Sequence, residues 1–251
     1  MPSQTPEPIH LYRAGRAKGR GTAWLIQHRF TRNTSESFDD GWGTLEQHAH
    51  EEHLPERTQV IEEQAKAILA SNDSPDIAFD LSINPYRGCE HGCVYCFARP
   101  THSYLNLSPG LDFETRIIAK VNAAQRLREA FASRAYEPAM LNLGSATDAY
   151  QPVERKLRIT RGIVEVLSEC SHAFSLVTKS AGVERDLDLL APMASRGLVA
   201  AYVSITTLDP ELARIMEPRA ASPQRRLQTI ATLVKAGVPV GVSVSPVIPF
   251  I

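Results

Sequence analysis

The sequence predicts an α/β fold in which a parallel sheet is built from alternating strands and helices. The apolar, strand-like runs from residue 77 onward are 78–83, 139–143, 173–178, 198–205 and 238–244. The helical patterns between them are 112–132, 159–170, 185–196 and 222–236. Strands that alternate with helices pair in parallel through right-handed crossovers, and nearly continuous apolar strands are covered on both faces.

Polar residues follow directly after each of these strands. They are Asn84 with the cysteine-containing loop after it, then 144–148, Lys179-Ser180, Thr206-Thr207 and Ser245-Pro246. In a parallel barrel the loops at the carboxyl ends of the strands converge on one face, where active sites form. We therefore expect a single site to which every strand contributes.

Residues 1–76 differ in composition from the rest of the chain. They begin Pro-rich, continue with the basic run 13–21, and show no sustained periodicity before 59–69, which the pattern predicts to be one helix. We interpret 1–76 as an N-terminal extension, partly disordered and packed on the core near Trp42, and 77–251 as the core domain. The basic run is typical of a solvated tail, with a phosphate contact as the alternative.

Composition places the chain among ordinary globular proteins. Of its 251 residues 43% are hydrophobic and 22% charged, and the formal net charge of −1 gives no global reason to bind nucleic acid. The sequence contains no apolar run of transmembrane length and does not begin with a signal-peptide pattern. We expect a cytoplasmic protein without membrane contact, in which close-set cysteines are metal ligands rather than disulfides.

Three of the four cysteines, Cys89, Cys93 and Cys96, are spaced Cys-x3-Cys-x2-Cys. Thiolates on one loop suit zinc, copper(I) or an iron–sulfur cluster, and three ligands leave one coordination position open for chemistry. Cys170 lies in the predicted helix 159–170, where we expect a buried small hydrophobic side chain. A remote fourth ligand is the alternative.

The triplet, with Tyr95 before its last cysteine and a strand that opens a βα series before it, resembles the radical S-adenosylmethionine (SAM) superfamily over about residues 77–251. Asn84-Pro85-Tyr86-Arg87-Gly88 and Phe97-Ala98-Arg99 resemble the spore photoproduct lyase branch, often labelled DNA repair photolyase-like, and its uncharacterised bacterial members. Other matching segments are 147–154, 178–180, 217–219 and 243–249.

The resemblance implies a (βα)6-type TIM-like barrel, the radical SAM core. The family pattern continues beyond the fifth strand with a helix and a sixth strand, whereas this chain stops at Phe250-Ile251. We expect a C-terminally truncated, partial barrel. The alternative is that a partner covers the exposed edge of the fifth strand.

The resemblance also implies the cofactors. Cys89, Cys93 and Cys96 would each bind one iron of a [4Fe-4S] cluster, and SAM would chelate the fourth. An electron from an external donor such as flavodoxin or ferredoxin would cleave SAM to a 5′-deoxyadenosyl radical that abstracts hydrogen from a substrate. The substrate is unknown, and a nucleic acid is suggested by kinship alone.

Further residues match the SAM-binding positions of the family. Tyr95 would pack against adenine, and Val247 would border it. Lys179 would pair with the methionyl carboxylate, with a solvated lysine as the alternative. Ser204 would donate to the same carboxylate or would satisfy a backbone group.

Thr147 and Asp148 match the turn that contacts ribose and the amino group. Asp148 has an alternative as a turn residue bonded to its own backbone. His91, inside the cysteine loop, would be a zinc ligand in a zinc site; we favour a solvent-facing or outer position.

Other residues of the matching segments have structural roles as an alternative to contact with substrate or cofactor. Tyr86, Arg87 and Phe97 are expected to wedge the cysteine loop into place. Glu217 and Arg219 would form a surface ion pair or contact substrate or cofactor.

One departure from the branch concerns the substrate. Spore photoproduct lyases carry a hydrogen-donating cysteine just before the ribose-contacting turn, and the corresponding residue here is Ser145. Serine donates hydrogen poorly, which argues against action on thymine photoproducts.

Two alternatives to an enzymatic function remain. One is a zinc-binding module that associates with nucleic acid, and the other is a structural or electron-transferring cluster.

Overall fold

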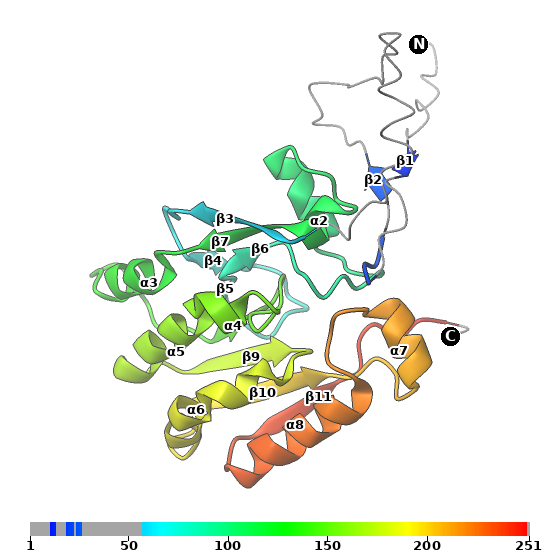
Figure 1. Cartoon of the computed structure of the whole chain (residues 1–251). Coiled ribbons are helices and arrows are strands. Elements are labelled where there is room, and N and C mark those ends of the chain that lie inside the picture. Colours follow the sequence, from blue (N-terminus) through cyan, green and yellow to red (C-terminus); the bar gives the residue numbers. More distant parts are fainter. Residues whose placement is uncertain (1–10, 14–18, 23, 27–56, 250–251) are drawn as a thin grey trace.

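The computed structural model describes residues 11–13, 19–22, 24–26 and 57–249 (Figure 1). Its main sheet has six strands in the order β11-β10-β9-β8-β5-β4. These are β4 (Leu69–Ser71), β5 (Leu81–Ile83), β8 (Leu141–Leu143), β9 (Phe174–Thr178), β10 (Val199–Ser204) and β11 (Val240–Ser243). Neighbours pair in parallel except β4 with β5. The predicted α/β fold with its parallel strands is confirmed.

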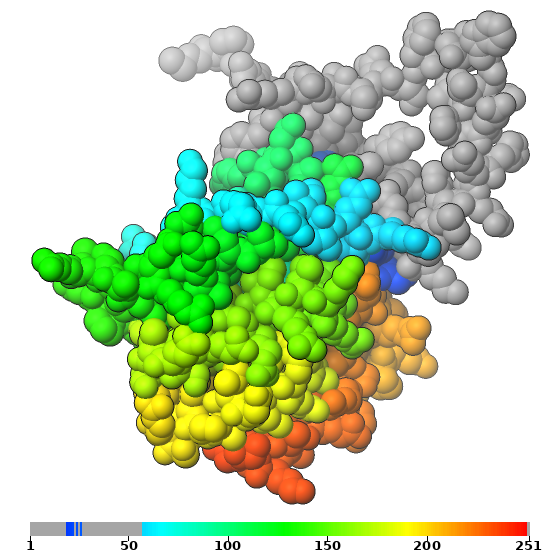
Figure 2. Space-filling view, turned by 60° about the vertical axis from the view of Figure 1, so that its left-hand side comes forward, coloured from blue at the N-terminus to red at the C-terminus, as the bar shows by residue number. Residues whose placement is uncertain are grey.

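Helices cover one face of this sheet (Figure 1). They are α3 (Ala123–Phe131), α5 (Ile159–Glu169), α6 (Leu187–Ala194) and α8 (Pro223–Lys235). Figure 2 shows the successive units following one another across the molecule in chain order. This arrangement is expected when each βα unit packs beside the one before it.

The two faces of the strands differ in polarity. Leu141 and Leu143 of β8 are fully buried in the apolar core beneath the helices. The side chain of Asn142, between them, points to the opposite face of the sheet, where its Nδ2 donates to Ser175 Oγ at 2.9 Å. The face away from the helices is therefore partly polar.

A second sheet of three strands lies beside the main one, in the order β3-β7-β6. It comprises β3 (Gln59–Glu63), β7 (Arg116–Lys120) and β6 (Tyr86–Arg87). The helix predicted over 59–69 is wrong, because this stretch contains β3 and β4. Val60 and Ile61 are β-branched, and β3 gains a parallel partner in β7, which outweighs local helical preference.

The single helix predicted over 112–132 is also wrong. The structure has α2 (Asp112–Thr115), then β7, then α3. Asn122 closes β7 by donating to Ala65 O at 3.0 Å and accepting from Ala65 N at 2.8 Å. This contact comes from a segment 57 residues away, so the local pattern does not contain it.

The remaining elements are short. They are β1 (Leu11–Arg13), β2 (Trp24–Ile26), the 3-10 helices η1 (Arg99–Leu105) and η2 (Ala181–Asp186), α4 (Glu154–Leu157) and α7 (Pro210–Met216). The sequence pattern missed α7, although Asp209 followed by Pro210 is a helix-start signal. Asp209 Oδ1 accepts from the amides of Glu211 and Leu212. Within the described part of the chain, no helix is long and apolar enough to cross a membrane.

The interpretation of residues 1–76 as an N-terminal extension stays a prediction. Trp42 and most of residues 1–56 lie outside the described residues, so the expected disorder and the contact near Trp42 stay predictions.

Cys170 is exposed at the end of α5, contrary to the buried position expected. The buried stripe of α5 passes through Ile163, Val166 and Leu167, and Cys170 falls beyond its last turn.

Gly144, in the turn after β8, offers a test of this architecture. Its φ is +88°, and an added Cβ would lie 3.0 Å from Val177 O. Gly144→Ala should destabilise the fold by about 1–3 kcal/mol in urea unfolding. Gly162→Ala is the matched control: the new Cβ would contact Ala124 at an ordinary 3.4 Å in a helix, so stability should hold or rise. Equal stability of the Gly144 variant and the wild type would contradict the assigned turn.

Candidate functional site

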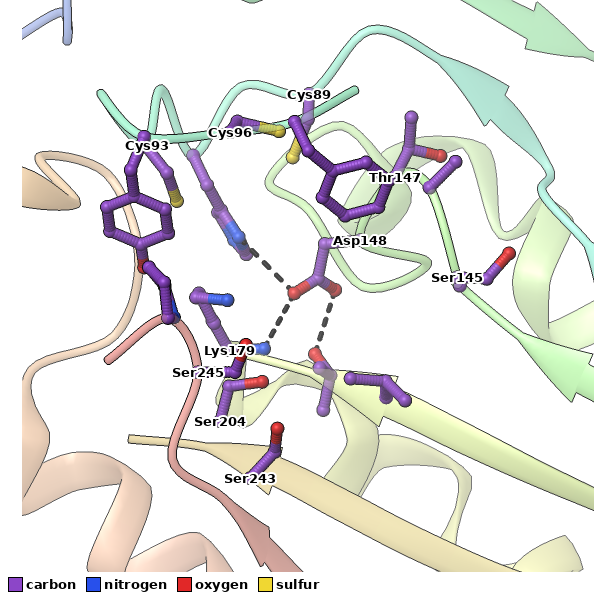
Figure 3. A pocket seen from close by; sticks show the side chains of 18 residues that line it. Cys89, Cys93, Cys96, Ser145, Thr147, Asp148, Lys179, Ser204, Ser243 and Ser245 are labelled. Carbon is purple, nitrogen blue, oxygen red and sulfur yellow. Dashed lines mark hydrogen bonds and ion pairs between the residues drawn. The ribbon is translucent and has the colours of Figure 1, made fainter. Parts of the chain in front are cut away.

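The carboxyl ends of the main-sheet strands surround a cavity of about 280 Å³ (Figure 3). The cysteine loop lies along one side, and Ser204, Ser243 and Ser245 lie on the opposite side at the ends of β10 and β11. Asp148 and Lys179 lie between them. The structure thus brings the cysteine loop, the turn 144–148, Lys179 and Ser245-Pro246 to one cavity, as the barrel geometry predicts. The other polar residues expected there do not line it; they are Asn84, Ser180, Thr206 and Thr207.

The three cysteines of the loop are free thiols that line this cavity. Cys89 and Cys93 are buried and Cys96 is half-buried. Two glycines allow the loop to fold tightly, since Gly88 and Gly92 have φ values of +82° and +66°. The amide of Cys89 donates to Phe113 O at 2.9 Å, which ties the loop to α2.

Burial keeps the inner thiols protonated when no metal is bound. It raises the pKa of Cys89 well above its ordinary value and that of Cys93 to about 12. Binding of a metal would displace both protons, because the thiolate is the ligand.

The donor set is compatible with a cluster, since three soft thiol side chains of one loop line one cavity. Among the described residues, no group of three or more Cys, His, Asp or Glu side chains converges to hold one ion. In a cubic cluster each thiolate binds a different iron. Three soft ligands facing one cavity meet that requirement without meeting at a point.

Asp148 is buried and its carboxylate is fully used by protein groups. Oδ1 accepts from Tyr150 N and Thr178 Oγ1, both at 2.8 Å, and Oδ2 accepts from Lys179 N at 2.7 Å. Oδ2 also lies 3.3 Å from His91 Nδ1. Burial alone would raise the pKa of Asp148, but His91 and these hydrogen bonds hold it at about 2.

This arrangement matches the turn alternative for Asp148 and corrects one view of His91. Only 2% of His91 is exposed, so it does not face solvent. It lines the cavity and joins the cysteine loop to the turn that carries Asp148.

Thr147 and Asn84 organise the same turn. Thr147 Oγ1 donates to Tyr86 O at 3.0 Å. Asn84 accepts from Ala146 N at 2.8 Å and donates to Ser145 Oγ at 3.1 Å. The sequence places Asn84 directly after the first strand and at the start of the segment 84–88, and its position after the strand is the signal that points to this role.

Lys179 and Ser204 face the cavity with free polar groups. Lys179 Nζ lies 5.9 Å from the centroid of the Tyr95 ring. Within the described part of the chain, neither Lys179 Nζ nor Ser204 Oγ makes a hydrogen bond or an ion pair. Val247, in contrast, is 80% exposed and does not line the cavity.

Tyr95 is held by a buried ion pair behind the cavity. Its hydroxyl donates to Glu217, whose other oxygen pairs with Arg226, and only 1% of either charged side chain is exposed. Burial opposes ionisation of Glu217, yet the charge of Arg226 keeps the pKa of Glu217 below its ordinary value. Arg226 also donates to Ser204 O at 2.9 Å, which links two cavity residues.

Of the two alternatives for Glu217 and Arg219, the surface ion pair is wrong, and a contact with substrate or cofactor stays a prediction. Arg219 instead pairs with buried Glu90 at 3.1 Å, and Glu217 with Arg226. Sequence proximity favoured Arg219, whereas α8 brings Arg226 into the interior. Neither Arg226 nor Glu90 was identified from the sequence.

The three expected wedge residues differ in their surroundings. Tyr86 is 1% exposed and its hydroxyl donates to buried Glu154, as expected for a wedge. Arg87 pairs with Glu63 at the surface, and Phe97 is 79% exposed. Tyr86 is thus the one that packs.

Comparison with known proteins identifies the family. Residues 83–251 match the model of the radical SAM superfamily. The chain belongs to this superfamily. A spore photoproduct lyase complexed with dinucleoside spore photoproduct has a similar fold, with a TM-score of 0.53 and 18% identity over 76% of this chain and 52% of that one.

The chain is also similar to other proteins. A spore photoproduct lyase variant with bound AdoMet and dinucleoside spore photoproduct has a TM-score of 0.54 at 18% identity, covering 74% of this chain and 51% of that one. An uncharacterised protein of Mycobacterium bovis is 39% identical over 72% of this chain and 54% of its own length. One of Methanocaldococcus jannaschii is 25% identical over 77% of this chain and 69% of its own length. This chain spans about half the length of the mycobacterial relative.

Proposed function

We propose that this radical SAM protein holds a [4Fe-4S] cluster through Cys89, Cys93 and Cys96 and binds SAM in the adjoining cavity. When bound, these cofactors supply reductive cleavage of SAM to a 5′-deoxyadenosyl radical that abstracts hydrogen from a substrate. The observation that carries the proposal is the set of three free thiols on the same cavity as Lys179 and Ser204. An external reductant such as flavodoxin or ferredoxin would deliver the electron.

The uncommitted polar groups are proposed to bind SAM. Lys179 Nζ would pair with the methionyl carboxylate and Ser204 Oγ would donate to it. The Tyr95 ring, held by Glu217, would pack against adenine. We assign no contact to Val247, because its side chain faces solvent.

Thr147 and Asp148 are proposed to act through the turn they form. Both oxygens of Asp148 are already occupied, so a direct contact with ribose would require it to release a protein partner. Its proposed role is to hold His91 and the Lys179 backbone in place.

The substrate stays open. The solved relatives bind a dinucleoside spore photoproduct, and kinship alone suggests a nucleic acid here. Ser145 at the proposed hydrogen-donor position, with its hydroxyl bound by Asn84, argues against repair of that photoproduct.

Anaerobic reconstitution tests the cofactor chemistry. The full chain should take up about four irons and four sulfides. Dithionite and SAM should then give 5′-deoxyadenosine, and SAM should perturb the magnetic resonance spectrum of the reduced cluster. One zinc per chain without a cluster, or a cluster that leaves SAM intact, would contradict the proposal and support one of the binding-module alternatives.

Lys179→Met tests the carboxylate contact. Loss of a hydrogen bond to a charged group should weaken SAM binding by about 10- to 150-fold, measured by equilibrium binding to the reconstituted protein. Lys235→Met is the control, since Lys235 ends α8 and does not line the cavity. Equal SAM affinity in the two variants would remove Lys179 from the site.

A further inference from the structure

Arg99, three residues after the last cysteine, binds the backbone of the cysteine loop. Its Nε and Nη2 donate to Cys93 O at 3.1 and 2.9 Å. Nη2 also donates to Gly92 O at 3.2 Å. A further bond reaches Gly110 O at 3.1 Å. The planar guanidinium thus binds two adjacent carbonyls of the loop at once.

Glu114 holds this arginine. Its side chain is fully buried, and Oε1 pairs with Arg99 at 2.5 Å. A buried carboxylate needs several donors. The second oxygen, Oε2, accepts from the amide of Gly21 at 2.8 Å, so the N-terminal extension supplies a missing partner.

The contact between the extension and the loop is close enough to require glycines. A Cβ on Gly21 would lie 1.7 Å from Gly92 O, and one on Gly92 would lie 2.6 Å from Glu114 Oε2. Both clashes are far below ordinary van der Waals contact. The backbone of residue 21 therefore lies directly against the loop between two cluster ligands.

The neighbouring residues fasten the extension on both sides. Arg20 donates to Glu114 O at 2.9 Å and to Thr58 Oγ1 at 3.2 Å. Thr58 Oγ1 donates to the loop residue Glu90 at 2.6 Å. On the other side Trp24 O accepts from Leu111 N at 2.9 Å.

From these contacts we propose that Arg99 is a positioning residue for the cluster ligand Cys93. Gly21 of the N-terminal extension supports Arg99 indirectly, because its amide donates to Glu114, the carboxylate that pairs with Arg99. Arg99, Glu114 and Gly21 are called the clasp. The inference rests on the proposed function, since it assigns Cys93 to the cluster. The described part of the extension at residues 20–22 and Trp24 is then a component of the cofactor site.

The clasp has an electrostatic consequence for the cluster. The charge on Arg99 is balanced by Glu114. Removing that balance would leave a cation beside the cluster, which stabilises the more negative, reduced form and raises the reduction potential. A residue with a purely structural role would not shift the potential in a defined direction.

Hydrogen exchange of the metal-free full chain tests the clasp without any cofactor. Gly21→Ala should speed exchange of the amides of residues 92–96 by about tenfold, as expected when a hydrogen bond to a charged group is lost. Gly162→Ala is the control, because Gly162 lies inside α5 with an ordinary helical φ and a Cβ there would contact only Ala124 Cβ, at 3.4 Å. Arg99→Lys keeps the charge and loses the fork, so it should give the same increase and decides the matter if Gly21→Ala does not fold.

Reconstituted protein gives the second readout. Glu114→Gln should raise the midpoint potential of the cluster, and Gly21→Ala should shorten its lifetime in air, while Gly162→Ala changes neither. Unchanged loop exchange in folded Gly21→Ala and Arg99→Lys, or an unshifted potential in Glu114→Gln, would overturn the clasp. If the wild type takes up no cluster, the proposed function fails, while loop exchange still judges the contact.

Discussion

Alanine at Cys89, Cys93 or Cys96 should abolish formation of 5′-deoxyadenosine and lower the iron content of the reconstituted chain to a small fraction of the wild-type value. Each thiolate binds a separate iron in a cubic cluster, so no neighbouring thiol can take over its position. The three side chains line one cavity, with Cys89 and Cys93 buried. The measurements are iron and sulfide per chain, the charge-transfer absorbance, and nucleoside product after reduction with SAM present.

Cys170→Ala is the matched control for these variants. Cys170 is exposed at the end of α5, just before β9 begins, and does not line the cavity. The control should keep wild-type iron content and product yield. Full product yield from Cys96→Ala would show that the triplet is not the cluster site, and loss of iron from Cys170→Ala would identify a remote fourth ligand.

The five parallel strands of the main sheet could be predicted because their signal is local, whereas the antiparallel strand β4 was not. Runs such as 173–178 are short, apolar and rich in β-branched residues, and the structure places β9 there with its ends shifted by one residue at most. The same holds for the cysteine triplet, whose spacing alone sets three ligands on one loop. Such features need only a few neighbouring residues to be recognised.

The errors arise where distant segments decide the structure. Residues 59–69 form strands because β7 and β5 pair with them. In the site, Arg226 replaces Arg219 as the partner of Glu217 because α8 carries it inward. Neither the pairing nor the helix packing is written in the local pattern.

The same limit applies to Asp148. Its place after a strand correctly predicted a position at the cavity. Which of its neighbours would use the carboxylate depended on Thr178 and His91, which come from two other segments. The resemblance to a family names a position, and the structure shows how many of its hydrogen bonds are already taken.

Arg226→Met should destabilise the fold by about 3–5 kcal/mol at neutral pH in urea unfolding, because it leaves the buried carboxylate of Glu217 without its cation. Arg128→Met is the control: Arg128 pairs with Glu169 at the surface, with 49% and 56% of the side chains exposed, and its loss should cost at most about 1 kcal/mol. Glu217→Gln combined with Arg226→Met should recover much of the loss, since Gln keeps an acceptor for Tyr95 and carries no charge.

The pH dependence gives this prediction a sign. In the wild type the pKa of Glu217 lies below its ordinary value, so the stability it contributes is present above that value and is lost as the pH falls through the folded-state pKa. Without Arg226, burial dominates and the pKa of Glu217 rises, so the folded variant takes up a proton more readily than the unfolded chain. The difference in unfolding free energy between Arg226→Met and the wild type should therefore shrink from pH 7 to pH 5. A difference that stays constant or grows over that interval would mean that Arg226 contributes through packing and its bond to Ser204 O rather than through the charge on Glu217.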